Sequence, residues 1–181
     1  MEEETDTAKL ISQLVFTADG RTRWNGYALP SMSKLKNTML FFIEKFGGVF
    51  VTQMNKLLFY ADFLSYRMRG MGLTGLVFKA APYGPVPERW DRVYSLVDDI
   101  EQVPIDSKNG NSGTKLVSTL EFDDASLSEE ELDCLTKIYE TFKDETPSTI
   151  SEISHKEAAW LDNIGSYARI DYDYAFSLKA V

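Results

Sequence analysis

The sequence is poor in the side chains that build most catalytic and metal sites, since its 181 residues include one cysteine, Cys134, and one histidine, His155. A single cysteine excludes a disulfide framework within the chain and is typical of a protein kept in a reducing cytosol. The paired Cys/His spacing of zinc sites is missing as well. The sequence therefore predicts no metal site and no bound cofactor.

Long apolar runs are also missing. The longest ones, such as MLFFI, are far too short to span a bilayer. The N-terminus reads MEEETD, and its acidic residues do not fit a signal peptide. These features predict a soluble cytoplasmic protein that has no membrane partner.

Positive charge is scarce too, because 19 Lys and Arg face 28 Asp and Glu, a formal net charge of −9. Phosphate contacts need clustered cations, so no direct binding of nucleic acid is expected. Most of the excess lies in residues 121–162, where thirteen acids accompany only three lysines. This segment forms either a solvated helical face or an acidic surface that steers a basic protein partner.

Helical spacing of apolar residues is the strongest pattern that is present. It predicts helices over residues 31–46, 52–69, 86–97, 128–143 and 146–153. The Thr52 hydroxyl is expected to cap the second of these, with apolar residues from Met54 to Met68 along one face. Pro85 or Pro87 suits the first turn of the third helix. Ser128 and Glu131 form a capping box at the start of the fourth.

Shorter segments alternate as strands do. Residues 74–81 (TGLVFKAA) predict a strand, and IEQVPI and KLVSTLEF, on either side of DSKNGNSG, predict a β-hairpin. The tail IDYDYAFSLKAV is expected to be a strand that turns into a helix. The fold class is therefore α+β, a mostly helical single domain with a small antiparallel β-sheet. Residues 1–31 are expected to form an arm or linker on a domain built by residues 32–181.

Few residues in the sequence suit a catalytic role. A Cys134–His155 dyad is conceivable, but Cys134 lies beside Leu132 and Leu135 in a predicted helix, where a small buried thiol is ordinary. The glycines of GMGLTG follow a helix and precede a strand, the reverse of a dinucleotide-binding loop. The sequence thus predicts a protein that is not an enzyme.

Two stretches carry more bulky or stiff residues than a simple connection needs. One is PYGPVPE at 82–88, whose prolines either shape a joint or hold Tyr83 ready for a partner. The other is SHKEAAW at 154–160, where His155, Glu157 and Trp160 either line the lip of a polar pocket or close the end of a helix.

The run NKLLFYADFLSYRMRGMGLTGLVFKAAPYGPVPE resembles the signature of the Panacea domain, found in the SocA-like antitoxins and the phage-associated GepA-like proteins. SHKEAAW and IDYDYAFSL are similar to the C-terminal landmarks of that family. The resemblance covers residues 32–178. Many similar antitoxins carry a DNA-binding module before this domain, so residues 1–31 are interpreted as a possible remnant of a lost or truncated module.

The resemblance implies an antitoxin of a toxin–antitoxin system, which binds its cognate toxin protein and blocks it. It also implies alternatives that use the same binding physics: an adaptor that delivers a toxin to a Clp-type protease, or a phage-related counter-defence protein. A small-ligand or hydrolytic role would require a pocket that contains His155, Glu157 and Asp62.

Large aromatic side chains dominate tight protein interfaces. The sequence-based candidates for contact with the partner are Tyr60, Tyr66, Tyr83, Pro85, Trp90, His155, Glu157 and Trp160. Met54, Leu58 and Phe59 are assigned to the core instead.

Overall fold

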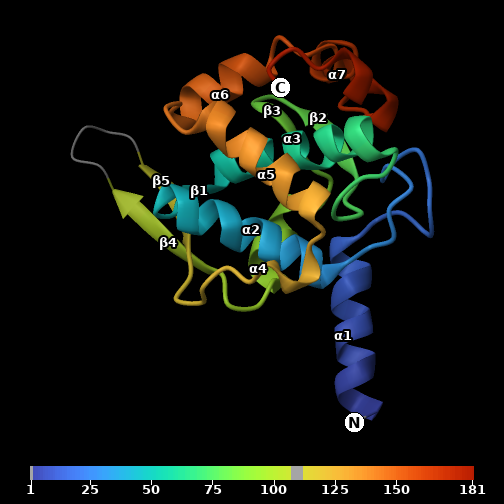
Figure 1. Ribbon diagram of the computed structural model, residues 1–181, viewed down its shortest axis with the longest axis vertical. Helices are drawn as coiled ribbons and strands as arrows, with labels where there is room; N and C mark the ends of the chain where they lie inside the picture. The colour runs from blue at the N-terminus through green and yellow to red at the C-terminus, as the bar shows by residue number, and fades with distance from the viewer. Residues whose placement is uncertain (1, 107–111) are drawn as a thin grey trace.

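A computed structural model describes residues 2–106 and 112–181 and shows a mostly helical α+β fold (Figure 1). Its centre is α3 (Val51–Arg69), in which every residue from 53 to 66 is buried. Around it pack α2 (Met32–Phe46), α5 (Glu129–Phe142) and α6 (Pro147–Ser154). Because α3 is enclosed on all sides, the predicted one-sided apolar stripe was wrong in extent, and Met68 at its end is 40% exposed.

Local signals placed the ends of α2, α5 and α6 well, but not the start of α3. The Ser31 hydroxyl caps α2 by accepting from the N–H of Lys34, and Gly47 ends that helix at φ 67°. Ser128 and Glu131 form the predicted capping box of α5, and Thr146 with Pro147 starts α6. Thr52 does not cap α3, which begins one residue earlier, directly after the short strand β1 (Val49–Phe50), and has no side-chain cap.

The N-terminal segment begins with α1 (Glu2–Val15), which projects from the body of the molecule (Figure 1). Only its end is anchored, since Val15 and the following Phe16 are buried and the helix packs against α4 (Trp90–Leu96). The sequence led us to expect an arm or linker here. That the segment is the remnant of a DNA-binding module stays a prediction.

A three-stranded antiparallel sheet lies at one side of the molecule, in the order β1 (Val49–Phe50), β5 (Ser112–Val117) and β4 (Glu101–Asp106). The predicted hairpin is therefore present, although β5 ends at Val117, earlier than expected. Beyond it the Ser118 hydroxyl donates to the Asp99 carbonyl and accepts from the N–H of Leu120, which turns the chain. The centre of the predicted turn, residues 107–111, falls outside the described residues.

A second, two-stranded sheet corrects the interpretation of the proline segment. Strand β2 (Phe78–Ala81) pairs with β3 (Gly84–Pro87), so Pro85 and Pro87 lie in a strand and not in the first turn of a helix. The predicted helix over 86–97 is the shorter α4.

In the C-terminal part of the chain, α7 (Ala158–Leu161) packs on this second sheet. The part of the chain after β5 also contains three 3-10 helices. These are η1 (Asp124–Ser126), η2 (Ile164–Ser166) and η3 (Tyr172–Ser177). The expected strand in the tail is reduced to a single bridge between Arg169 and Lys79 of β2, and η3 follows it. Within the described part of the chain, none of the helices combines the length and the apolar character that crossing a membrane requires.

Candidate functional site

The β2–β3 hairpin presents an aromatic side chain on a stiff support. Pro82 and Tyr83 form its two-residue turn, and the Tyr83 side chain is 75% exposed. Gly84 follows at φ 115°, a conformation that residues with a Cβ rarely adopt. The turn therefore holds Tyr83 outward at the end of the hairpin.

The register explains how two prolines fit into β3. Pro85 lies opposite Ala80 and Pro87 opposite Phe78, and the N–H of Glu88, one residue on, donates to the Val77 carbonyl at 2.8 Å. Hydrogen-bonded pairs alternate along an antiparallel ladder, so both prolines take the positions whose N–H would point away from β2. They fix the backbone torsions of β3 and cost no ladder hydrogen bond.

The outer edge of β2 is covered as well. The N–H of Ala80 donates to the Ala168 carbonyl at 3.0 Å, and the N–H of Ile170 donates to the Phe78 carbonyl at 2.9 Å. Between them, the Arg169 guanidinium donates to both carboxylate oxygens of Glu88, at 2.6 and 2.9 Å. A bidentate pair of this kind fixes orientation, so the hairpin is fastened at its base.

His155 and Trp160 support the turn from beneath. The indole N–H of Trp160 donates to the Ala81 carbonyl at 2.7 Å, and the His155 ring stacks on the indole with centroids 4.1 Å apart. Burial lowers the pKa of His155, a hydrogen bond with the Tyr83 backbone opposes this shift, and the Lys56 ammonium lowers the pKa further. His155 Nε2 is buried and has no hydrogen-bond partner among the described residues.

Lys56 and Ser154 lie directly under Gly84. A Cβ built on Gly84 would stand 2.4 Å from Lys56 Cε and 2.6 Å from Ser154 Oγ, so only glycine allows this approach. Burial lowers the pKa of Lys56 to about 8. Sequence analysis missed both residues; the signal for Lys56 was a lysine directly before the apolar run Leu57-Leu58-Phe59 of a predicted helix.

The structure thus brings together four of the candidates from the sequence: Tyr83, Pro85, His155 and Trp160. Tyr60 and Glu157 are a correction, because both are fully buried below the hairpin. Tyr60 Oη donates to Glu157 at 3.1 Å, and the same carboxylate accepts from the N–H groups of Lys179 and Ala180. These two residues bind the C-terminal tail to the core and are not available to a partner in this conformation.

Tyr66 lies elsewhere and is also nearly buried, at 9% exposed. Its hydroxyl donates to Asp173 at 3.0 Å, and burial, together with Asp173, raises the pKa of Tyr66 to about 12. Its ring packs against Tyr27, Tyr172 and Phe176. Its visible role is to hold η3 against α3.

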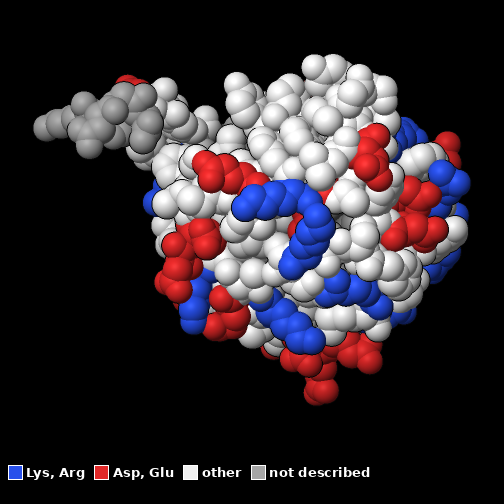
Figure 2. All heavy atoms as spheres, turned by 90° about the horizontal axis from the view of Figure 1, so that it is seen from above, with Lys and Arg blue, Asp and Glu red and all other residues white. Residues whose placement is uncertain are grey.

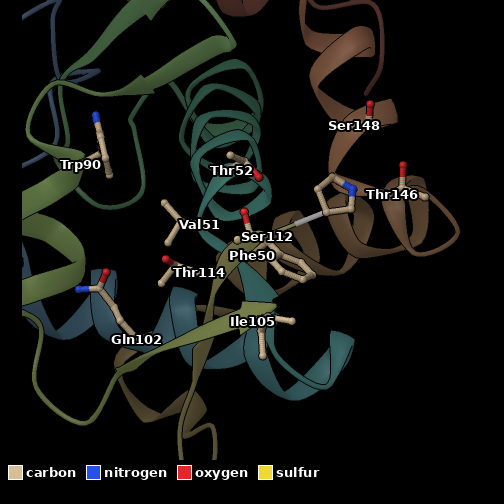
Figure 3. A pocket seen from close by; sticks show the side chains of 12 residues that line it. Phe50, Val51, Thr52, Trp90, Gln102, Ile105, Ser112, Thr114, Thr146 and Ser148 are labelled. Carbon is tan, nitrogen blue, oxygen red and sulfur yellow. The ribbon is translucent and has the colours of Figure 1, made fainter. Parts of the chain in front are cut away.

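Trp90 borders a groove of about 870 Å³ beside the three-stranded sheet (Figure 3). β4 and β5 contribute Gln102, Ile105 and Thr114, the β1–α3 junction contributes Phe50 and Thr52, and the start of α6 contributes Thr146 and Ser148. The twelve lining residues that belong to the described part of the chain are uncharged. The groove is a separate feature from the hairpin, and Trp90 is 42% exposed beside it.

The Asp62 carboxylate and the Cys134 thiol, both considered for catalysis, are fully buried and hydrogen-bonded within the core. Asp62 accepts from the N–H groups of Leu73 and Thr74 and from the Thr74 hydroxyl, and burial raises the pKa of Asp62 to about 6. The Cys134 thiol donates to the Ala61 carbonyl, and burial raises the pKa of Cys134 to about 12. Across residues 2–106 and 112–181, no three metal-binding side chains gather into a cluster.

The acidic residues of segment 121–162 fall into two groups, one buried and one exposed. Glu131 is buried, with ion pairs to Lys34 at 2.6 Å and Arg69 at 3.0 Å, and Glu157 is internal. The exposed acids on α5 include Glu129, Glu130 and Asp133. Seen from the α6–α7 end, charged side chains of both signs are spread over most of the face, and an uncharged area lies along its upper part (Figure 2).

Comparison with known proteins gives one match. Residues 54–161 match the family described as antitoxin SocA-like, Panacea domain. The match begins in α3 and ends in α7, so it contains the whole hairpin, Lys56, Ser154, His155 and Trp160. No curated protein and no solved structure matches the chain.

Proposed function

Because the chain belongs to the family of SocA-like antitoxins with a Panacea domain, we propose that it neutralises a protein toxin by direct binding and that the β2–β3 hairpin is its main contact. Family membership supports an antitoxin-type role. Direct occlusion of a cognate toxin, and the place of contact, are the parts that this proposal adds.

The exposure of Tyr83 carries the proposal. The Tyr83 side chain is 75% exposed, while the backbone of its hairpin is held by prolines, by the Arg169–Glu88 pair and by Trp160. Since the side chain is presented on a rigid turn, little entropy is lost when it docks. Tyrosines of this kind are frequent among the few residues that dominate binding energy.

The required affinity is within reach of such a surface. Stable neutralisation at nanomolar dissociation constants corresponds to about −12 kcal/mol. A standard interface buries about 1,600 Å² in total, which a hairpin tip alone does not supply. The partner is therefore expected to cover the hairpin and the neighbouring uncharged surface of α7, where Leu161 is 51% exposed.

Co-expression with the protein encoded beside this one is the direct test. The wild type should remove the toxicity of that neighbour, and Tyr83→Ala should restore it. Leu10→Ala is the matched control, because Leu10 is 56% exposed on α1, which projects from the opposite end of the molecule (Figure 1). Circular dichroism must show an intact fold in both variants.

Three results would contradict the proposal. Full rescue by Tyr83→Ala removes the hairpin from the interface. Binding of the purified partner that leaves it toxic unless a Clp-type protease is present favours the adaptor. A neighbour that is not toxic and does not bind argues against an antitoxin role.

A further inference from the structure

Strand β5 has an open edge where its neighbour β1 ends. β1 is two residues long and pairs with Lys115 and Leu116 of β5. The chain then enters α3 at Val51 and leaves the sheet, whereas β5 reaches back to Ser112. On this side of β5, Thr114 and Ser112 consequently have no neighbouring strand among the residues that the structure describes.

Pro104 shows which way the backbone of Thr114 points. Pro104 of β4 lies opposite Thr114 and has no N–H, yet the ladder continues on both sides of this pair. Only alternate pairs of an antiparallel ladder exchange hydrogen bonds, so Pro104 and Thr114 form a pair that does not. The Thr114 N–H therefore points away from β4, and the same alternation turns the N–H and C=O of Ser112 to that side.

This open edge forms part of the groove that Trp90 borders. Thr114 and Ser112 both line the groove (Figure 3). Gly113, between them, makes room for the Phe50 ring, since a Cβ built on Gly113 would stand 3.1 Å from Phe50 Cδ1. The groove therefore combines an aromatic ring with strand backbone that lacks a neighbour.

We propose that this groove accepts an extended segment of the protein partner, which adds to β5 as a further strand in line with β1. The inference rests on the proposed function for the identity of the partner, but its site is separate from the β2–β3 hairpin. The backbone of the segment binds the Thr114 N–H and the N–H and C=O of Ser112. In strand addition, backbone hydrogen bonds supply affinity and side-chain pockets supply specificity.

The charge of the groove selects the segment. Its described lining residues are uncharged, so a charged side chain would lose hydration there and meet no counter-charge. A peptide backbone is neutral and carries alternating donors and acceptors, which complement an open strand edge. The segment is therefore uncharged where it faces the groove, and Thr52, Thr146 and Ser148 offer hydroxyls to its side chains.

The other edge of the same sheet is protected against strand addition. β4 is its outer strand, and Pro104 offers no N–H there. Glu101 and Asp106, at the two ends of β4, are exposed acids. Proline and charge are common devices that keep other chains away from sheet edges. β5 has neither device at residues 112–114, so the two edges differ in the way that a binding edge requires.

The first test removes one backbone N–H. Thr114→Pro deletes the donor that faces the groove and costs no ladder hydrogen bond with β4, as Pro104 on the opposite strand shows. Thr114→Val is the matched control, because it keeps the N–H and the shape of the side chain. With the partner identified by co-expression, Thr114→Pro should weaken binding at least tenfold, a loss of about 1.4 kcal/mol. Thr114→Val should change it by less than threefold.

A second variant blocks the groove without changing β5. Thr52 is exposed at the start of α3 and lines the groove, so Thr52→Trp should fill part of it. Binding should weaken at least tenfold while the melting temperature stays close to that of the wild type. If Thr114→Pro does not fold, Thr52→Trp decides the point. Wild-type affinity in Thr52→Trp, or equal losses in Thr114→Pro and Thr114→Val, would overturn the inference.

Hydrogen exchange follows the edge itself. In the free protein, the Thr114 N–H should exchange faster than those of Gly113 and Lys115, which face β4. In the complex, its exchange should slow at least tenfold. Slow exchange already in the free protein, or exchange that the partner does not change, would contradict strand addition.

Synthetic peptides then identify the segment. Among overlapping peptides that cover the partner, one should shift the amide resonances of Thr114 and Ser112. Methylating its backbone nitrogens one at a time should abolish binding at alternate positions, because alternate N–H groups of an added strand face β5. Equal tolerance of the methyl group at every position would count against a strand.

The outcomes separate this inference from the proposed function. If Tyr83→Ala weakens binding and neither Thr114→Pro nor Thr52→Trp does, the hairpin is the contact and the strand site is wrong. If the two groove variants weaken binding and Tyr83→Ala does not, the strand site stands and the role of Tyr83 falls.

Discussion

The indole N–H of Trp160 donates to the Ala81 carbonyl at 2.7 Å and so joins α7 to β2 across 79 positions of the sequence. The bond holds the hairpin at the point where its turn begins. Trp160 also stacks on His155. One side chain therefore positions both the His155 ring and the turn that presents Tyr83.

Replacing Trp160 by phenylalanine tests this link. Trp160→Phe keeps an aromatic ring against His155 and leaves the Ala81 carbonyl without its donor, so the free energy of unfolding should fall by about 1–3 kcal/mol. Urea denaturation measures the loss, and hydrogen exchange at Ala80 and Val86 should show the hairpin opening more often. An unchanged exchange rate at the hairpin would contradict the positioning role.

Gly84→Ala should be among the most damaging substitutions in the hairpin. An alanine there adopts a φ of 115° and drives its Cβ to 2.4 Å from Lys56 Cε. Strain of this kind and the overlap together should cost about 2–4 kcal/mol. Thermal unfolding of the purified variant gives the size of the effect.

Gly70→Ala is the matched control for that substitution. Gly70 has φ 74° but nothing lies within 4 Å of the added Cβ, so only the backbone strain of about 1–2 kcal/mol remains. The difference between the two variants measures the close approach of Lys56 and Ser154 to the turn. Equal losses would mean that the hairpin shifts to make room.

Local signals in the sequence were enough to place most helices. The capping box at Ser128 and the Thr146-Pro147 start depend on residues within one turn, which a sequence shows directly. The hairpin was missed because prolines normally argue against a strand, and only the pairing register shows that Pro85 and Pro87 need no N–H there.

Burial of polar residues could not be predicted in the same way. Tyr60 was expected to contact a partner, Asp62 was considered for a polar pocket, and Asn55 drew no prediction. Their partners are distant in sequence: Glu157 for Tyr60, Tyr94 for Asn55 and Thr74 for Asp62. Such pairs are formed by tertiary structure, so a helical pattern read alone assigns them to the wrong side.

Stability should depend on pH through Lys56. The folded protein loses the Lys56 proton at about pH 8, whereas the unfolded chain keeps it until about pH 10.5. Folding therefore releases a proton between these values, and this group makes the folded state more stable as the pH rises, by about 3 kcal/mol in total. Below pH 8 the contribution is absent.

The difference in the free energy of unfolding between the wild type and Lys56→Met isolates the effect of Lys56. Buried tyrosine hydroxyls are common to both proteins, and they lower the stability as the pH rises to high values. Burial raises the pKa of Tyr94 and Tyr172, so their contribution to stability is lost as they ionise. Urea unfolding of both proteins at pH 7 and pH 9.5 should show the variant to be the more stable one at pH 7. A difference that does not change with pH would mean that Lys56 is charged in both states.

The exposed acids of α5 are expected to act on the rate of encounter. Exchanging Glu129, Glu130 and Asp133 for Gln, Gln and Asn removes three charges outside the hairpin, so the association rate with a basic partner should fall severalfold while the dissociation rate stays constant. Salt should slow the wild type more than the variant, since the Debye length is about 8 Å at physiological ionic strength. Glu131 must stay in place, because it pairs with Lys34 and Arg69. Stopped-flow kinetics decides the point: equal salt dependence in both proteins would make the acidic face a solvated surface without a role in steering.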